Sequence, residues 1–494
     1  MSQSERSLRH KMKLVRKYIG ILTILVITFF ACGCGGSSGS NYYEPPLDDA
    51  TRIEYVKEAF TFTFPLVYMH YNKVRFTNAM WPTPIAAPIN QFSHAEAISD
   101  VNYGEAFHAN LDIVCSQAFL DLGQDAVVFT KPTPDRFCIF ELYDAYTNCI
   151  MTMGKGTSSN AQKYLITGPF FKGKVPAGMT QVKVPTNMAW LVGRIRCFGE
   201  EDLENVKAIQ AKIEAKELDL YQKGKPQPVK TYYDPNEFVP LTKLRSLTAD
   251  EYFKLANELM IKNPPKAADA EVVSRMKRVG VGPGLTFNPL ILGENGYRYF
   301  ESMKDQCMYS EWASNSQQYL FRTSNHDSGK WNFYSDNIAN FGKQYDYRAY
   351  CAMNYLCAEP NSTCLVYFTT KDDDGKNLYG NYKYRLRFRK FPPVKENGFW
   401  SLTLYDANNH FVTEKDNTVF SINDLTELET NESGYTDVFL QPAASSSASV
   451  ASGTIPTPTN KSFHLLLRIY IPHEAAISGF WSAPILTVAE EQDK

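Results

Sequence analysis

Short apolar segments separated by turn residues fill two parts of this chain, at about residues 100–198 and from about residue 345 onward. RFCIFELYD and AWLVGRIRCF are examples from the first part, and KYRLRFRKF and FHLLLRIYIP from the second. Strand-like segments with turn signals at a spacing of roughly 8–12 residues are typical of all-β sandwiches. The chain also has 30 Tyr and 31 Phe residues, which favour half-buried pleated surfaces. We therefore expect two β-sandwich, jelly-roll-like domains.

Helical patterns occupy the stretch between the two β regions. Residues 200–221 carry acidic residues in the first turn and apolar residues at helical spacing. Thr248 and Glu251 form a capping-box pattern that predicts the start of another helix. The other segments with a helical pattern are 267–278, 290–308 and, with a strand as the alternative, 55–71. The predicted fold class is therefore mainly β with an α-helical insert between the two sandwich domains.

The chain is expected to have five parts, since a length of 494 residues is sufficient for several domains. In sequence order these are a signal peptide (1–34), a flexible tether (35–50), an N-terminal β domain (51–199), a mainly helical insert (200–344) and a C-terminal β-sandwich domain (345–494).

The first forty residues have the order of an export signal. Six basic residues precede an apolar run over 18–31, which is followed by Cys32, Cys34 and a Gly/Ser stretch. The apolar run is shorter than the about 20 residues that a membrane-spanning helix needs. This order suits a bacterial lipoprotein signal, so we predict export and lipid attachment to the cell envelope membrane through Cys32 or Cys34. An uncleaved membrane anchor and a plain signal peptide cut nearby are the alternatives.

The charge balance of the chain argues against binding to nucleic acid. The whole chain has 51 basic and 53 acidic residues, and residues 1–34 hold six of the basic residues and one acidic residue. The remainder therefore has a net charge of −7. A mildly acidic body has no general attraction for nucleic acid or for anionic membrane surfaces. We expect membrane attachment through the N-terminal segment alone.

Eight cysteines lie beyond Cys34, and none of them forms a CxxC pair. A structural zinc site is therefore not predicted, and neither is any other metal or cofactor. Export permits disulfides. Cys138 and Cys149 flank a predicted turn, so adjacent antiparallel strands would bring them together as a disulfide. Buried free thiols are the alternative for these two residues.

A series of short motifs follows the chain in a fixed order. In the first β region they are Asn110-Leu-Asp112, Leu120-Asp-Leu122, Tyr143-Asp-Ala-Tyr-Thr-Asn148, Gly168-Pro169 and Trp190 with Gly193-Arg194. In the second they are Arg348-Ala349, Asp372-Asp-Asp-Gly375 with Leu378-Tyr-Gly380, Pro392-Pro393, Phe399-Trp-Ser-Leu-Thr-Leu-Tyr-Asp406, Arg468-Ile-Tyr470-Ile-Pro472 and Gly479-Phe-Trp481 with Pro484. In this order the chain resembles DUF1254 followed by DUF1214, a pair of domains of unknown function in proteins that are often bacterial and exported. The resemblance implies two β-sandwich units with helices between them, and it implies no particular activity.

Three polar residues near the start of the first β region suggest a binding site. His108, Asn110 and Asp112 alternate with apolar residues, so a strand would place all three on one face. Imidazole and carboxylate groups bind metals, sugars or a reacting proton near neutral pH. A solvated strand face is the alternative, and a metal would need a further strong ligand. Our other candidates for lining a cleft between the β domains are Arg348, Arg468 and Tyr470.

These observations support two functions. The first is an envelope-anchored lipoprotein that binds a ligand or partner, such as a glycan, a small molecule or a protein. The second is an exported hydrolase or isomerase that acts in a cleft between the two β domains, where pockets tend to form. The sequence leaves open which of the two applies, and it gives neither the ligand nor the oligomeric state.

Overall fold

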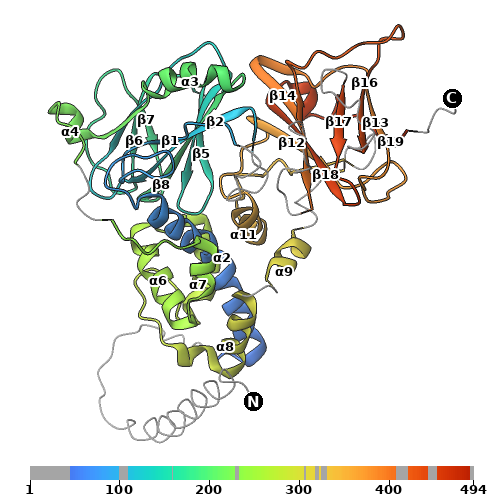
Figure 1. Cartoon of the computed structure of the whole chain (residues 1–494). Helices are drawn as coiled ribbons and strands as arrows, with labels where there is room; N and C mark the ends of the chain where they lie inside the picture. The colour runs from blue at the N-terminus through green and yellow to red at the C-terminus, as the bar shows by residue number, and fades with distance from the viewer. Residues whose placement is uncertain are drawn as a thin grey trace, which may run out of the picture.

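A computed structural model describes most of the chain beyond residue 44. The described residues are 45–99, 110–157, 159–228, 233–304, 308–316, 322–323, 331–407, 421–442 and 453–489. The predicted signal peptide with Cys32 and Cys34, most of the tether, and His108 lie outside the described residues. Two β sandwiches lie beside each other and a group of helices packs next to them (Figure 1). None of the helices in the described ranges combines the length and apolar character that a bilayer crossing requires.

The N-terminal sandwich consists of a five-stranded sheet and a four-stranded sheet. The first is ordered β1 (Ser93–His94), β2 (Ile113–Asp121), β8 (Met188–Arg196), β4 (Cys138–Asp144) and β5 (Cys149–Gly154). The second is ordered β7 (Thr180–Lys183), β6 (Lys163–Thr167), β3 (Val127–Thr130) and β9 (Glu214–Glu217). Alternate residues point between the sheets, so that Phe140 and Leu142 of β4 pack with Phe129 of β3 in the core.

The C-terminal sandwich has the same two-layer construction. Its six-stranded sheet is ordered β10 (Arg322–Thr323), β11 (Asn332–Phe333), β12 (Cys364–Thr369), β18 (Phe463–Pro472), β14 (Val394–Asp406) and β15 (Ser421–Asn423). The four-stranded sheet is ordered β17 (Thr454–Thr457), β16 (Thr436–Pro442), β13 (Tyr384–Phe388) and β19 (Leu486–Val488). Tyr384, Leu386 and Phe388 point into the core, whereas Arg387 of the same strand pairs with Asp437 on the surface. The predicted pair of β sandwiches is confirmed.

The long helix α2 (Asp49–Phe76) is the centre of the helical group. Around it lie α5 (Pro240–Arg245), α6 (Ala249–Lys262), α7 (Ala270–Lys277), α8 (Gly293–Ser302), α9 (Met308–Asn315) and α11 (Tyr345–Asn354). Stacked and tilted rings of Phe60, Tyr252 and Trp312 fill the centre of this group. The capping box of α6 is present, because Thr248 accepts from Glu251 N and Glu251 accepts from Thr248 N.

The predicted helix over 200–221 is wrong in its middle. The segment contains a 3₁₀ helix (Glu200–Asp202), α3 (Leu203–Gln210), strand β9 and α4 (Leu218–Gln222). Residues 214–217 pair with β3 and complete the four-stranded sheet, so tertiary pairing overrides the local helical pattern. Three further short elements are the 3₁₀ helices Ala267–Asp269 and Pro289–Leu292 and helix α12 (Glu474–Ile477).

The helical group includes segments from outside the predicted insert at 200–344. Helix α2 lies within the range predicted as the N-terminal β domain, yet it packs with α5 to α8. Helix α11 lies within the range predicted as the C-terminal domain and also packs on α2. The ambiguous segment at 55–71 is helical because residues on all sides of α2 are buried, which removes the one-sided pattern of a surface helix.

The predicted disulfide between Cys138 and Cys149 is wrong. Both residues are free thiols, as the alternative reading expected. They do lie on the adjacent strands β4 and β5, but the register pairs Tyr143 with Cys149 and Ile139 with Gly154. The two cysteines therefore lie near opposite ends of the hairpin, which is too far apart for a disulfide.

Candidate functional site at the domain interface

The two β domains meet through the outer faces of their larger sheets. Ile113 and Ile139 of the N-terminal domain pack against Phe399 and Tyr470 of the C-terminal domain, and all four are buried. The rings of Phe399 and Tyr470 are stacked with centroids 4.2 Å apart. Polar side chains surround this apolar contact on both domains. An apolar contact with polar side chains around it therefore joins the two domains.

Asn110 and Asp112 do lie at this interface, but they do not form a strand face. Strand β2 begins at Ile113, and Asp112 N donates to Asn110 Oδ1 at 2.8 Å in a local turn. The predicted strand geometry is thus wrong, because the Asn side chain satisfies the backbone group that a strand would pair. Asn110 Nδ2 donates to the hydroxyl of Tyr470. Two of the predicted residues, from the two domains, are therefore in direct contact.

Asp112 is nearly inaccessible to solvent, with 5% of its surface exposed. Its Oδ1 accepts from Asn423 Nδ2 of the C-terminal domain at 2.8 Å, and its Oδ2 has no hydrogen-bond partner. Burial raises the pKa of Asp112, and the hydrogen bond from Asn423 partly opposes that rise. Asp112 is thus a buried acid that faces the other domain.

Arg468 and Tyr470 lie two residues apart on β18 and share the face that meets the N-terminal domain. Arg468 Nη1 donates to the hydroxyl of Tyr405 at 2.8 Å. Both Arg468 and Tyr470 are buried. The structure therefore brings four predicted residues to one interface.

Arg348 does not belong to this group. It lies on α11 in the helical group, where its Nη2 donates to the carbonyl of Phe62 at 3.1 Å. Its guanidinium lies over the rings of Phe62, Tyr146 and Tyr345, at 4.8, 5.2 and 5.1 Å from their centroids. Arg348 thus contributes to packing between α2, α11 and the loop after β4.

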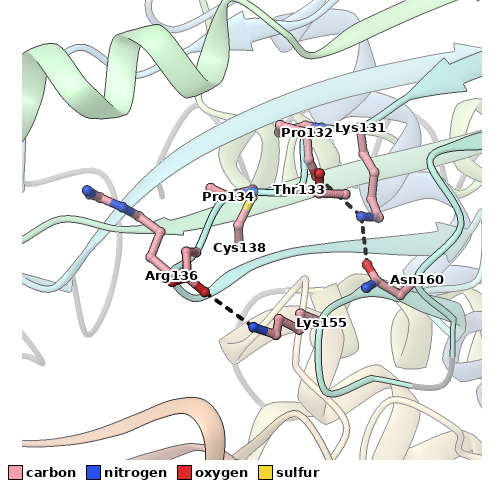
Figure 2. A pocket seen from close by; sticks show the side chains of 9 residues that line it. Lys131, Pro132, Thr133, Pro134, Arg136, Cys138, Lys155 and Asn160 are labelled. Carbon is pink, nitrogen blue, oxygen red and sulfur yellow. Dashed lines mark hydrogen bonds and ion pairs between the residues drawn. The ribbon is translucent and has the colours of Figure 1, made fainter.

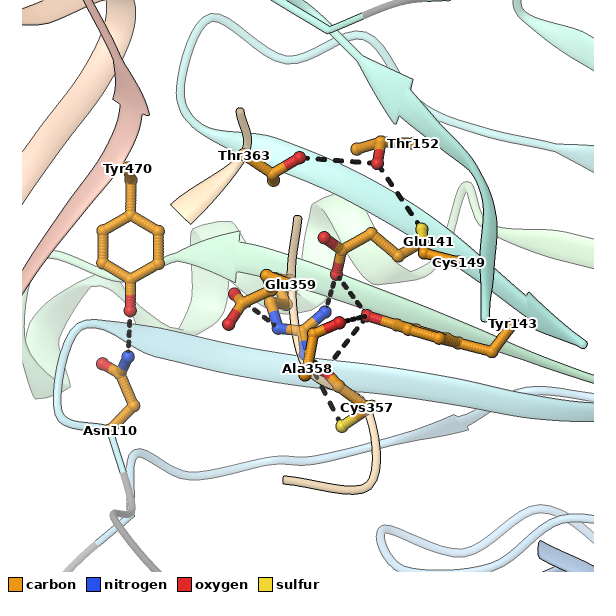
Figure 3. A network of polar contacts seen from close by, with 11 residues as sticks. Asn110, Glu141, Tyr143, Cys149, Thr152, Cys357, Ala358, Glu359, Thr363 and Tyr470 are labelled. Atoms are coloured by element: carbon orange, nitrogen blue, oxygen red, sulfur yellow. Dashed lines mark hydrogen bonds and ion pairs between the residues drawn. The ribbon is translucent and has the colours of Figure 1, made fainter. Parts of the chain in front are cut away.

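A second polar cluster at the interface was not found from the sequence. Arg194 of β8 pairs with Glu141 of β4 and, at 3.1 Å, with Glu359 from the loop between α11 and β12 (Figure 3). Arg194 Nη2 also donates to the carbonyl of Cys357 at 3.0 Å. One guanidinium is therefore shared between two carboxylates. The sequence feature that could have indicated this cluster is Arg194 itself, which lies in the largely apolar segment AWLVGRIRCF. A charged residue in a buried strand requires a partner.

Glu141 is completely buried, and its protonation depends on this cluster. Burial and the charge of Glu359 raise the pKa of Glu141 and Arg194 lowers it, with a net rise to about 8. The hydroxyl of Tyr143 lies 3.2 Å from Glu141 Oε2 and within 3.1 Å of the carbonyls of Cys357 and Ala358. The cluster thus fixes the 357–359 segment to the N-terminal sheet.

Two thiols lie close to this cluster. Cys115 is the cross-strand partner of Arg194 and its side chain is exposed, while Cys357 Sγ lies 3.6 Å from Arg194 Nη2. Burial raises the pKa of the Cys357 thiol to about 11. Cys357 is thus a protonated thiol near neutral pH. Within the described part of the chain, no three His, Cys, Asp or Glu residues form a group that would hold a metal ion.

A small pocket opens in the N-terminal domain where it borders the C-terminal domain (Figure 2). The loop between β3 and β4 and the turn between β5 and β6 enclose a volume of about 100 Å³. Lys155 on its wall pairs with Asp135 at 3.3 Å and with Glu396 of β14 at 2.8 Å. The pocket therefore lies at the edge of the same interface.

Comparisons with known proteins identify the two β regions. The model of DUF1254, described as a protein of unknown function, matches residues 89–217, and that of DUF1214, described in the same words, matches residues 364–474. Both matches confirm the resemblance and its order. No curated protein matches the chain at a significant level.

Solved structures support the same architecture. The crystal structure of the VPA0106 protein from Vibrio parahaemolyticus superposes with a TM-score of 0.63 and 19% sequence identity, over 89% of this chain and 100% of that one. A protein from Burkholderia cenocepacia has a TM-score of 0.40 and 10% identity, over 89% of this chain and 95% of its own. The first of these likenesses shows a shared fold.

Proposed function

We propose that this chain, which combines a DUF1254 domain with a following DUF1214 domain, is an exported, membrane-tethered binding protein. The observation that carries the proposal is the pairing of polar groups across the domain interface. Asn110 contacts Tyr470, Asp112 contacts Asn423, and Arg194 holds Glu359. Side chains that are paired in this way fix the arrangement of the two domains.

The Cys357 thiol at the interface also favours binding over catalysis. A catalytic cysteine needs a thiolate, which forms when the pKa is lowered by nearby positive charge. Here burial outweighs the effect of Arg194 at Cys357, so the pKa of its thiol is raised. The pocket beside Lys155 offers a place for a ligand at the border of the two domains.

The tether is the part of the proposal that rests on the N-terminal sequence. The basic residues, the apolar run and Cys32 with Cys34 supply its support. Labelling with a palmitate analogue tests it in cells of the source organism, with wild type compared with Cys32→Ala and Cys34→Ala. Loss of label in one variant identifies the modified cysteine, and equal absence of label in wild type contradicts the lipid tether.

Binding is tested by screening the full chain in detergent. Thermal denaturation is measured with panels of oligosaccharides, phosphorylated metabolites and peptides, and the same panels are examined for chemical change. A ligand that raises the melting temperature in a saturable manner and is recovered unchanged supports the proposal. Turnover of any panel member by the wild-type chain contradicts it.

The second candidate function is the exported hydrolase or isomerase. One observation favours it, which is that Asp112 and Glu141 are buried acids with raised pKa values at a domain interface. Asp112→Asn and Glu141→Gln keep the shape of each side chain while removing the titratable proton. If turnover is found and both variants abolish it without altering the fold, the interface is catalytic.

A further inference from the structure

Lys131 places a buried positive charge in the pocket at the domain border. Only 2% of the residue is exposed. Its Nζ donates to Asn160 Oδ1 at 2.9 Å and to the carbonyl of Pro132 at 3.2 Å (Figure 2). Both acceptors are neutral. An ammonium group can donate three hydrogen bonds, so these two leave it one short of its capacity and without a compensating charge.

The other two cations that line the pocket are neutralised. Arg136 forms a two-pronged ion pair with Asp202, and Lys155 pairs with Asp135 and Glu396. Among the described residues, no carboxylate pairs with Lys131. Burial without such a partner lowers the pKa of Lys131. Since buried charges in proteins are normally paired or bind an ion, this lysine indicates a missing anion.

We propose that the pocket binds a small oxyanion, a phosphate, sulfate or carboxylate group, with Lys131 as its charge partner. The hydroxyl of Thr133 on the same wall is a further donor. The volume of about 100 Å³ exceeds the roughly 10–15 Å³ that one water molecule needs by the same measure. A single oxyanion group therefore fits this space. The inference deepens the proposed function, on which it rests, by naming the chemical class of the ligand.

Asn160 offers a variant that removes the site without removing the lysine. Asn160→Asp has nearly the same shape, and its carboxylate would stand where Oδ1 now accepts from Lys131 at 2.9 Å. Asn160 is exposed, so the fold tolerates the change. Lys131→Met deletes the charge and keeps an apolar stem. Lys207→Met is the control, because Lys207 pairs with Glu204 on α3 and does not line the pocket.

The experiment is isothermal titration of the full chain in detergent with inorganic phosphate, sulfate and acetate, at ionic strength held constant with chloride. We expect saturable binding to wild type and to Lys207→Met, and binding about tenfold weaker or more in Asn160→Asp and Lys131→Met, because a hydrogen bond to a charged group is lost. Stronger binding of phosphate or of acetate identifies the ligand group as a phosphoryl or a carboxylate.

Two results would overturn the inference. They are the absence of saturable binding of all three anions to wild type, and equal affinity in wild type and Asn160→Asp. Melting temperatures of the variants, measured without anion, show that a loss of binding does not come from unfolding. Discovery of turnover elsewhere in the chain would contradict the proposed function and leave this titration unchanged, so the two failures are distinguishable.

Discussion

Replacing Arg194 with methionine should destabilise the protein strongly. The guanidinium is the only described cation paired with the fully buried Glu141, and it also binds Glu359 and the carbonyl of Cys357. Removing one partner of a buried ion pair leaves the other charge uncompensated, at a cost of about 3–5 kcal/mol. We therefore expect Arg194→Met to lower the free energy of unfolding by about that amount at pH 8, measured by urea denaturation with tryptophan fluorescence.

The double variant Arg194→Met/Glu141→Leu removes the whole ion pair, whereas the single variant leaves the carboxylate of Glu141 buried without a partner. Buried pairs replaced by apolar residues of similar size are often neutral or stabilising, so the double variant should recover most of the lost stability. Arg298→Met is the control, because its pair with Glu294 is exposed and should contribute only about 0–1 kcal/mol.

The cost of Arg194→Met should also depend on pH, with a definite sign. Glu141 has a pKa of about 8 in the folded chain, against its ordinary value of 4.5 in the unfolded chain. Below about pH 4.5 both states carry the proton, and between pH 4.5 and 8 the unfolded chain releases it first, so stability falls as the pH rises. Without Arg194 this fall extends to higher pH. The difference between wild type and Arg194→Met should therefore be smaller at pH 5 than at pH 8.

Two outcomes would refute this reasoning. One is an Arg194→Met variant that unfolds within about 1 kcal/mol of wild type at pH 8, as an exposed pair would allow. The other is a double variant as unstable as the single one, since the cost would then come from lost packing around the arginine stem and not from the stranded carboxylate of Glu141.

Three further changes test other parts of the structure by the same urea measurement. Relative to wild type, Asp112→Asn should gain stability between pH 4 and pH 7. Burial raises the pKa of Asp112, so the unfolded wild-type chain releases this proton first and wild type loses stability as the pH rises. An unchanged difference between the two proteins contradicts this. Tyr470→Phe removes the hydroxyl that accepts from Asn110 and should cost about 1 kcal/mol, while no loss would mean that water replaces the contact. Thr248→Ala removes the cap of α6 and should cost about 0.5–2 kcal/mol, with Ser246→Ala as a neighbouring control outside the cap.

Local patterns predicted the elements that depend on nearby residues. The capping box at Thr248 gave the start of α6 because the two hydrogen bonds that define it join residues three positions apart. The alternation of KYRLRFRKF gave strand β13 because one face of the strand is buried. The pattern over 200–221 failed for the opposite reason, since strand β9 forms only by pairing with β3, which lies about ninety residues earlier.

The interface was predicted in part for a similar reason. The alternation of polar and apolar residues selected Asn110 and Asp112, and Arg468 and Tyr470 were candidates for lining a cleft between the domains. These four residues do meet, although the local geometry of Asn110 was taken for a strand. Arg348 was a candidate for the same cleft, and it lies in the helical group instead. The pairing of Arg194 with Glu359 joins residues more than 160 positions apart, and no periodicity within either segment encodes such a contact.

The contrast between Arg194 and Lys131 indicates where a ligand is missing. Both are buried cations at the border of the two domains, but Arg194 has two carboxylates and a carbonyl, whereas Lys131 has two neutral acceptors. A cation that holds domains together needs partners supplied by the chain, as Arg194 has. A cation whose partner comes from outside must be left without one in the free protein, and it must border a space that the partner can enter. Lys131 meets both conditions, so the closed cluster around Arg194 fixes the two domains and the open pocket at Lys131 is where binding is to be sought.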